Sequence, residues 1–326
     1  MFRHVFLAVC ILFAVHSTAV LASDTDAQNS PPKKIAYIVS DLRIPFWDIM
    51  WRGVKSKAEA LSYGVSVYSA DNDAKRELEH VAEVLKSGVD GLVISPTNSS
   101  ATVTILKLAK AAGVPVAISD IGTDGGEYLT YISSDNEAGS YGLGRILVHE
   151  MIDRGWEEGR VGIIAIPQKR ANGKARTNGF MRALNEAGIK GAGMRQQVTF
   201  SYQETYDYAA DLINTNLDLR ALWLQGSDRY QGALDAIKDA GKEGEVLLIC
   251  FDAEPEFLDM IPDGQLVGAG MQQPFLMGEK AVEALDDHFN GNQVPKEHKL
   301  TVLAISKLTI QASLPTIRRN VLGLID

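Results

Sequence analysis

Polar side chains follow the short apolar runs of this sequence at nearly every point where such a run ends. They are carboxylates, amides, hydroxyls and an arginine, and they stand at Ser40-Asp41, Ser95–Asn98, Ser119-Asp120, Gln168–Arg170, Gln225–Asp228, Asp252 and Gln272-Gln273. Such groups donate and accept hydrogen bonds, and an ionised carboxylate can accept from two adjacent hydroxyls. The chemistry that they favour is the capture of a small polar molecule by hydrogen bonding.

The spacings typical of catalytic and metal-binding motifs are absent from the sequence. There is no GxSxG, HExxH or CxxC motif, and the six histidines are scattered. The segment Asp71-Asn72-Asp73 lacks the glycine and distal glutamate of a calcium loop, which favours a polar turn and helix cap. We therefore predict no catalytic residue, no metal and no cofactor. A hydrolase that uses Asp120 and Asp252 as acid and base remains the enzymatic alternative, since the sequence does not give their separation.

Alternating strands and helices have to position these polar groups. The apolar runs are mostly continuous, as in strands that are covered on both faces, and they span 35–39, 65–68, 91–94, 114–118, 161–166, 221–224, 246–251 and 266–269. Helical segments lie between them, at 46–61, 74–86, 101–112, 137–154, 174–187, 205–214, 231–240 and 274–289. Several of these segments end just before a glycine, the residue favoured at helix C-termini. Repeated β-α-β units with short links predict an α/β fold of doubly wound parallel sheets.

The length of the chain is consistent with one large domain or with two lobes. The 326 residues contain two β-α series, one from Ile35 to about Ser134 and one from Glu137 to about Gln272. Ligands of parallel sheets bind outside the carboxyl ends of the strands. Two such sheets that face each other would bring the polar groups to one cleft.

The N-terminal residues predict export. Arg3 precedes a mostly apolar stretch at 5–15 and small or apolar residues at 20–22, which is the pattern of a signal peptide cleaved after Ala22. An uncleaved anchor is the alternative. Residues 23–32 are polar and end in proline, which predicts a disordered leader. We expect a soluble mature protein in the periplasm.

The charge and the cysteines exclude other classes of protein. The net charge of −9 argues against nucleic acid as a partner, because phosphate binding needs clustered Lys and Arg. Cys250 is the one cysteine outside the predicted signal peptide, and it lies in an apolar run, which favours a buried inert thiol.

Segments in consistent order resemble the periplasmic ribose- and galactose-type binding proteins. They are Tyr37–Trp47, Gly91–Thr97, Gly113–Asp120, Ile132–Asn136, Lys174–Phe180, Phe251-Asp252 and Met271–Pro274, and the resemblance extends from Lys33 into the 290s. It implies two Rossmann-like lobes joined by a three-segment hinge, with residues 33–134 and 273–304 in the first lobe and 135–272 and 305–326 in the second. It also implies a monomer that captures a sugar or polyol and delivers it to an ABC importer.

Two other roles share this architecture. A sensing subunit would present the ligand to a membrane receptor such as a histidine kinase or chemoreceptor. The ligand core of a soluble transcription repressor is a further alternative, although the predicted signal peptide and the lack of an N-terminal helix-turn-helix argue against it.

The resemblance implies ligand-binding residues on both lobes. They are Ser40, the aromatic pair Phe46 and Trp47, Asp120, Arg176, the opposing aromatic Phe200, Ser227, Asp252 and Gln272. Ile44 and Ile121 depart from the family pattern, because polar residues usually stand there, and this argues against ribose itself as the ligand. Asp120 and Asp252 beside Arg176 would leave one excess negative charge, which favours a neutral or cationic ligand.

Three of these residues have a structural alternative. Trp47 could pack in the core with Trp51, Asp252 could cap a helix, and Arg176 could be a solvated helix residue.

Overall fold

The computed structural model describes residue 1 and residues 31–324, and the chain from Lys33 onward forms one compact unit. The predicted signal peptide at 1–22 and most of the predicted leader at 23–32 lie outside the described residues. Within the described residues, no helix is both long enough and apolar enough to cross a membrane.

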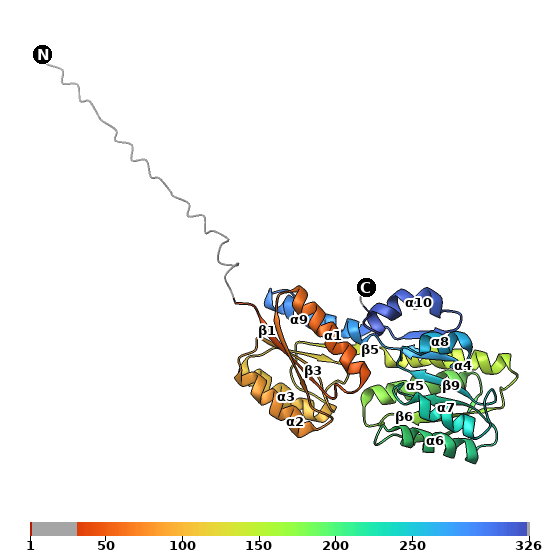
Figure 1. Ribbon diagram of the computed structural model, residues 1–326. Helices are drawn as coiled ribbons and strands as arrows, with labels where there is room; N and C mark the ends of the chain where they lie inside the picture. The colour runs from red at the N-terminus through yellow and green to blue at the C-terminus, as the bar shows by residue number, and fades with distance from the viewer. Residues whose placement is uncertain (2–30, 325–326) are drawn as a thin grey trace. The chain divides into compact units, whose positions relative to one another are not determined.

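The first sheet consists of six parallel strands in the order β11-β5-β4-β3-β1-β2. The strands are β1 (Lys34–Val39), β2 (Gly64–Ser69), β3 (Gly91–Ser95), β4 (Val116–Ser119), β5 (Thr130–Ser134) and β11 (Glu297–Leu300). Its helices are α1 (Pro45–Ala60), α2 (Ala74–Lys86), α3 (Ser99–Ala112) and α9 (Pro274–Phe289). Helices α1 and α9 lie on one face, and α2 and α3 lie on the other (Figure 1).

Strand β1 is apolar from Ile35 to Val39 because successive side chains point to opposite faces of the sheet and both faces are covered. Ile35, Tyr37 and Val39 pack in the cluster formed with α1 and α9. Ala36 and Ile38 pack in the cluster formed with α2 and α3. Both faces of the strand are therefore removed from water, as the continuous run predicted.

The second sheet repeats this topology in the order β12-β10-β9-β8-β6-β7. Its strands are β6 (Arg160–Ala165), β7 (Lys190–Gln196), β8 (Leu219–Leu224), β9 (Leu247–Phe251), β10 (Gly268–Met271) and β12 (Leu303–Ser306), and β12 runs antiparallel to β10. The accompanying helices are α4 (Asn136–Asp153), α5 (Ala171–Glu186), α6 (Tyr202–Thr215), α7 (Tyr230–Asp239), α8 (Phe257–Asp263), α10 (Ile310–Thr316) and the π-helix η2 (Ile317–Val321). The prediction of two doubly wound α/β lobes is confirmed.

The chain passes between the two sheets three times. The passages are the short links from β5 to α4, from β10 to α9 and from β11 to β12. The third passage falls at Thr301-Val302 and not after residue 304 as the sequence predicted, because Leu303 already pairs with Met271 in the second sheet.

The described C-terminal segment contacts both lobes. Ile317, Val321 and Leu322 pack in a core cluster of the second lobe. Arg319 forms an ion pair with Glu279 on α9 at 2.9 Å, and Arg52 on α1 donates to the carbonyl oxygens of Leu322 and Gly323, both at 3.1 Å. The segment predicted to belong to the second lobe, 305–326, is thus also tied to the first.

Several strands had no strong apolar signal. Strand β7 is polar and rich in glycine, and none of its residues is buried, because it lies at the edge of the second sheet. Strands β5, β7, β11 and β12 were not among the predicted runs, although β12 lies in the apolar stretch Val302–Ile305. Cys250, by contrast, is fully buried in β9, as predicted.

Helix α1 packs closely against α9, and this contact fixes the position of α1. Gly278 on α9 faces the α1 backbone, and a Cβ added there would lie 2.7 Å from the Val54 nitrogen and closer still to the Met50 oxygen. Gly53 on α1 approaches the Phe275 backbone in the same way. Backbone atoms cannot move aside as side chains do, so these glycines set the distance between the two helices.

We expect Gly278→Ala to lower the free energy of unfolding by about 1–3 kcal/mol, because the added methyl group overpacks two backbones. Urea denaturation followed by circular dichroism measures this change. Gly125→Ala is the control, since a Cβ there meets no atom within 4 Å. Equal stability of the two variants would contradict the tight helix contact.

Candidate functional site

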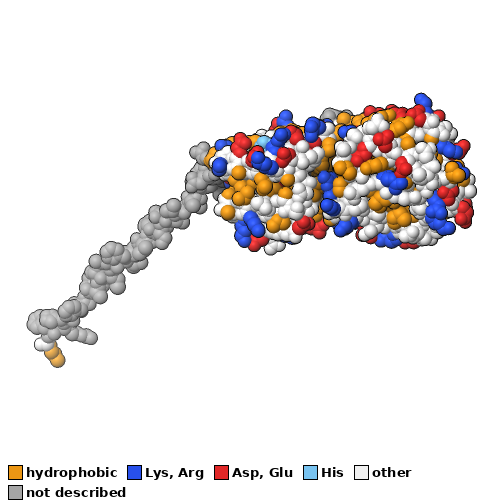
Figure 2. Space-filling view, turned by 90° about the horizontal axis from the view of Figure 1, so that it is seen from below, with side chains coloured by type: hydrophobic (Ala, Val, Ile, Leu, Met, Phe, Trp, Pro, Cys, Tyr) orange, Lys and Arg blue, Asp and Glu red, His pale blue; other side chains and the backbone are white. Residues whose placement is uncertain are grey.

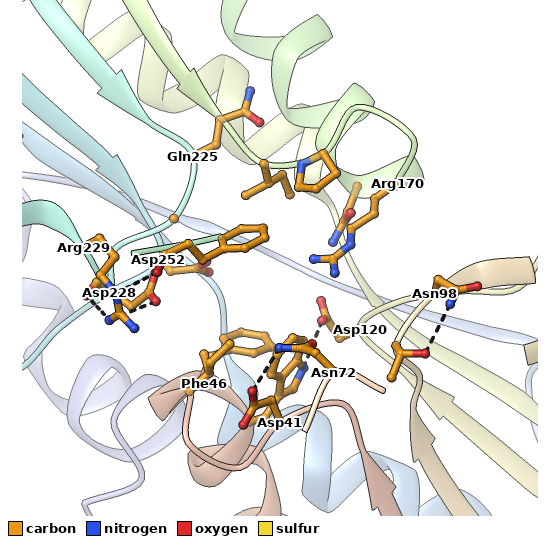
Figure 3. A pocket seen from close by; sticks show the side chains of 18 of the residues that line it. Asp41, Phe46, Asn72, Asn98, Asp120, Arg170, Gln225, Asp228, Arg229 and Asp252 are labelled. Atoms are coloured by element: carbon orange, nitrogen blue, oxygen red, sulfur yellow. Dashed lines mark hydrogen bonds and ion pairs between the residues drawn. The ribbon is translucent and has the colours of Figure 1, made fainter. Parts of the chain in front are cut away.

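A cavity of about 710 Å³ is lined by loops at the carboxyl ends of strands from both sheets (Figure 3). The outer surface shows a furrow where the two lobes meet (Figure 2). The cavity lining includes seven of the nine predicted site residues, namely Phe46, Trp47, Asp120, Arg176, Phe200, Asp252 and Gln272. This convergence follows from topology, because parallel strands direct their carboxyl ends to one edge of each sheet.

The other two predicted residues lie outside this lining. Ser40 is fully buried and donates to the Asn72 side-chain oxygen at 2.7 Å. Ser227 donates to the Glu254 carboxylate at 2.8 Å and borders a smaller neighbouring cavity. Each hydroxyl holds another polar side chain in place, and ligand binding by these two serines stays a prediction. Asn72 and Asp228 line the main cavity instead.

An aromatic pair from the first turn of α1 lines the cavity on the first lobe. Phe46 and Trp47 meet edge to face, with ring centroids 6.2 Å apart. Trp47 is 6% exposed and belongs to the core cluster under α1, and its Nε1 donates to the Asp120 carboxylate at 3.2 Å. Trp47 therefore packs in the core and lines the cavity at the same time.

Asp120 ends β4 in an unusual backbone conformation. Its φ of 64° lies in the left-handed region, and its N–H donates to the Ile132 carbonyl at 3.0 Å. Burial raises the pKa of Asp120 to about 6, with the Arg176 charge opposing this rise and the Asp252 charge adding to it. At neutral pH the carboxylate is mostly ionised and accepts hydrogen bonds.

Arg176 is a buried member of the second lobe and not a solvated helix residue. It is 3% exposed, and its guanidinium lies 4.0 Å from the Phe251 ring centroid. It donates to the Asn136 side-chain oxygen at 2.8 Å and to the Gln225 carbonyl at 2.7 Å. Two of its five N–H donors are therefore used within the protein.

Asp252 lines the cavity and does not cap a helix. Helix α8 begins at Phe257 with Glu256 at its N-cap. The Asp252 carboxylate lies 3.5 Å from Arg176 and accepts from Gln272 Nε2 at 2.6 Å. Burial raises the pKa of Asp252, and the charge of Arg176 opposes this rise.

Gln272 carries an unused acceptor in the cavity wall. The side chain is 2% exposed, and among residues 31–324 nothing donates to its Oε1. A buried carbonyl oxygen without a donor is costly, and the bond from Gln272 Nε2 to Asp252 holds the side chain in this position.

The cavity lining holds equal numbers of acidic and basic side chains. The acids are Asp41, Asp120, Asp228 and Asp252, and the bases are Arg43, Arg170, Arg176 and Arg229. The predicted excess negative charge is therefore wrong for the cavity as a whole. The balance of charges favours a neutral ligand over either ion.

The sequence located the loops but missed several side chains within them. Asp41, Asn98, Arg170 and Gln225 all belong to segments that were recognised as polar ends of strands. Asn72 belongs to the turn predicted as a helix cap, a role that Asp73 fills by accepting from the Lys75 and Arg76 amides. Among the described residues, no cluster of three or more His, Cys, Asp or Glu side chains could hold a metal ion.

Known proteins resemble this chain over nearly its whole length. The family model of a periplasmic binding protein domain matches residues 35–293. The ribose import binding protein of Bacillus subtilis is 29% identical over 290 residues, which are 89% of this chain and 91% of that protein. The D-allose-binding periplasmic protein of Escherichia coli is 25% identical over 272 residues, or 80% and 86% of the two chains.

Solved structures share the fold at lower identity. An ABC transporter solute-binding protein from Actinobacillus succinogenes with bound D-allose has a TM-score of 0.80 and 20% identity, and the match covers 86% of this chain and 99% of that one. A solute-binding protein from Mycobacterium smegmatis with bound glycerol has a TM-score of 0.78 and 21% identity, over 86% and 96% of the chains.

We expect Asp120→Asn to stabilise the protein above pH 7. An acid whose pKa rises on folding stabilises the native state below its unfolded pKa, here near 3.8, and this contribution is lost as the pH rises through about 6. Asparagine does not titrate, so the variant should exceed the wild type by about 3 kcal/mol at pH 8 and by little near pH 4. Urea denaturation across this pH range measures the difference.

The control is Asp124→Asn, which changes an exposed carboxyl a few residues away. A stability difference for Asp120→Asn that stays constant with pH would contradict the burial of the charge.

Proposed function

The chain belongs to the periplasmic binding protein family, and on this premise we propose that it captures a monosaccharide or polyol between its lobes and delivers it to an ABC importer. The observation that carries the proposal is the cavity itself. It combines an aromatic pair with carboxylates, amides and arginines from the strand ends of both sheets.

The lining suits a polyhydroxylated molecule. The Trp47 and Phe46 rings offer apolar surface to the C–H face of a sugar ring, while its hydroxyls stay free for polar partners. The carboxylates of Asp120 and Asp252 accept hydrogen bonds from hydroxyls. The similarity of this chain to ribose- and allose-binding proteins supports this ligand class.

Closure of the lobes would complete the site. Phe46, Trp47 and Asp120 belong to the first lobe, whereas Arg176 and Asp252 belong to the second. Each lobe alone satisfies only part of a ligand, so the ligand favours the closed state. The three passages at 134–136, 271–274 and 300–303 would act as the hinge.

We also propose that the protein is exported and that it does not alter its ligand chemically. The predicted signal peptide at 1–22 would direct the protein to the periplasm, where its ligand is taken up from outside. The site residues then bind and release the ligand unchanged. An N-terminal sequence of the exported protein that starts near Ser23 would support the cleavage.

A thermal-shift screen tests the ligand class. We expect a sugar or polyol such as D-allose, D-ribose or glycerol to raise the melting temperature, because a ligand that binds only the native state stabilises it by mass action. Asp120→Ala should abolish the shift while the protein remains folded. A response to nucleosides or small amines alone would contradict the sugar class, and the appearance of product from glycosides would contradict a binding-only role.

We expect Trp47→Ala to weaken sugar binding by about 1–3 kcal/mol, because it removes the surface on which the ring stacks. Isothermal titration calorimetry with the sugar found in the screen measures this loss. Trp51→Ala is the matched control, since Trp51 lies one turn further along α1 and stacks on Tyr37, outside the cavity lining. An equal loss in both variants would assign the effect to the stability of the helix.

A further inference from the structure

The cavity lining contains three ion pairs, and each of them joins residues of the same lobe. The pairs within one lobe are Arg43 with Asp41 at 2.6 Å, Arg229 with Asp228 at 3.2 Å and Arg176 with Asp252 at 3.5 Å. The remaining acid is Asp120 of the first lobe, and the remaining base is Arg170 of the second. Their charged groups point toward each other across the cavity without touching (Figure 3).

The guanidinium of Arg170 has free donors. Arg170 is the N-cap residue of α5, and within residues 31–324 its side chain has neither a hydrogen-bond partner nor an ion-pair partner. Arg43, Arg176 and Arg229, in contrast, all donate to protein oxygens. Among the four cavity arginines, Arg170 is thus the one whose guanidinium has no hydrogen-bond or ion-pair partner in residues 31–324.

An aromatic side chain supports Arg170 from behind. Its guanidinium lies 5.9 Å from the Phe200 ring centroid, within the range of a cation–π contact. Phe200 has a φ of 55°, which is rare for a bulky residue. The conformation is held from both sides, since the Phe200 N–H donates to Glu204 at 2.8 Å and its carbonyl accepts from Arg229 at 2.9 Å.

We propose that Arg170 is a ligand-anchoring residue opposite Asp120, and that the two together select a neutral ligand with hydroxyl groups over a charged one. This inference rests on the proposed function and narrows its ligand class. A carboxylate only accepts hydrogen bonds, and a guanidinium only donates them. A ligand that contacts both must therefore donate to Asp120 and accept from Arg170, and hydroxyl groups do both without carrying a charge.

The opposite charges of Asp120 and Arg170 disfavour a charged ligand between them. A sugar acid would satisfy Arg170 but would place its carboxylate against Asp120. An amino sugar would satisfy Asp120 but would leave the cation of Arg170 without a partner. An unpaired charge in a desolvated site is costly, whereas a neutral ligand leaves Asp120 and Arg170 to balance each other.

The first experiment measures binding by isothermal titration calorimetry with D-allose, D-ribose, D-glucose, D-galacturonate and D-glucosamine. We expect the wild type to bind a neutral sugar at least tenfold more tightly than either charged one. Arg170→Met should weaken that binding at least tenfold, and Arg170→Lys should weaken it less. Lys169→Met is the matched control, because it removes a neighbouring positive charge that does not line the cavity.

The second experiment needs no ligand. The Trp47 indole donates to Asp120, so Trp47 fluorescence should follow the protonation of Asp120, and Asp120→Asn should remove the transition. The groups near Asp120 are Arg170, Arg176, Asp252, Tyr37 and Tyr131. Loss of the Arg170 charge should move the midpoint to higher pH in Arg170→Met, while Lys169→Met should leave it in place.

The two experiments test the role of Arg170 separately from sugar binding by the protein. A neutral sugar that binds Arg170→Met as tightly as the wild type would overturn the anchor and leave the function intact, and a preference for D-galacturonate would overturn the selection of neutral ligands. If none of these sugars binds the wild type but the midpoint moves in Arg170→Met alone, the function fails and the pair across the cavity stands. Equal midpoints in Arg170→Met and Lys169→Met would overturn the pair.

Discussion

Eight charged side chains line one cavity, and much of the surrounding structure serves to balance those that are buried. Each buried charge needs an opposite charge or hydrogen bonds to offset the loss of water. Arg176 shows how far this goes, since it contacts an amide oxygen, a backbone carbonyl, a carboxylate and the face of Phe251. The balance also limits the ligand, because an added ion would disturb a site whose own charges sum to zero.

Three residues that line the cavity have a left-handed backbone conformation, which sets the direction of their side chains. Asp120, Phe200 and Asp252 all have positive φ values, although none is glycine. Such conformations persist only where the surroundings hold them, and they concentrate at functional sites. For both aspartates the backbone N–H is fixed by the neighbouring strand, through Ile132 and Gly270 respectively. The turn at the end of each strand thereby directs a carboxylate into the cavity.

The connections between the lobes determine how this cavity can open and close. Three short passages and the C-terminal segment join the sheets, and the segment adds side-chain contacts from Arg319 and Arg52. Because Asp120 and Arg170 belong to different lobes, their mutual attraction grows as the lobes approach. A neutral ligand between them would link recognition to closure without any change in charge.

The sequence by itself determined the α/β class, the two lobes and the loops that form the site. Continuous apolar runs, helices ended by glycine and polar residues after each strand are local signals, and local physics produces them. Strand β5, the edge strand β7 and the short strands β11 and β12 were not predicted as apolar runs. For β7 and β11 the reason is that their pairing and not their hydrophobicity makes them strands. The position of the third passage likewise depends on the pairing of β12 with β10.

Only the tertiary structure decided which polar side chains line the cavity and which support it. Ser40 and Ser227 resemble ligand contacts in the sequence, yet each hydroxyl is used within the protein. Arg170 carries no distinguishing pattern, and its role follows from the absence of a partner and from Asp120 on the opposite lobe. Charge pairing across a cleft joins residues that are distant in the chain, so no local pattern of residues can reveal it.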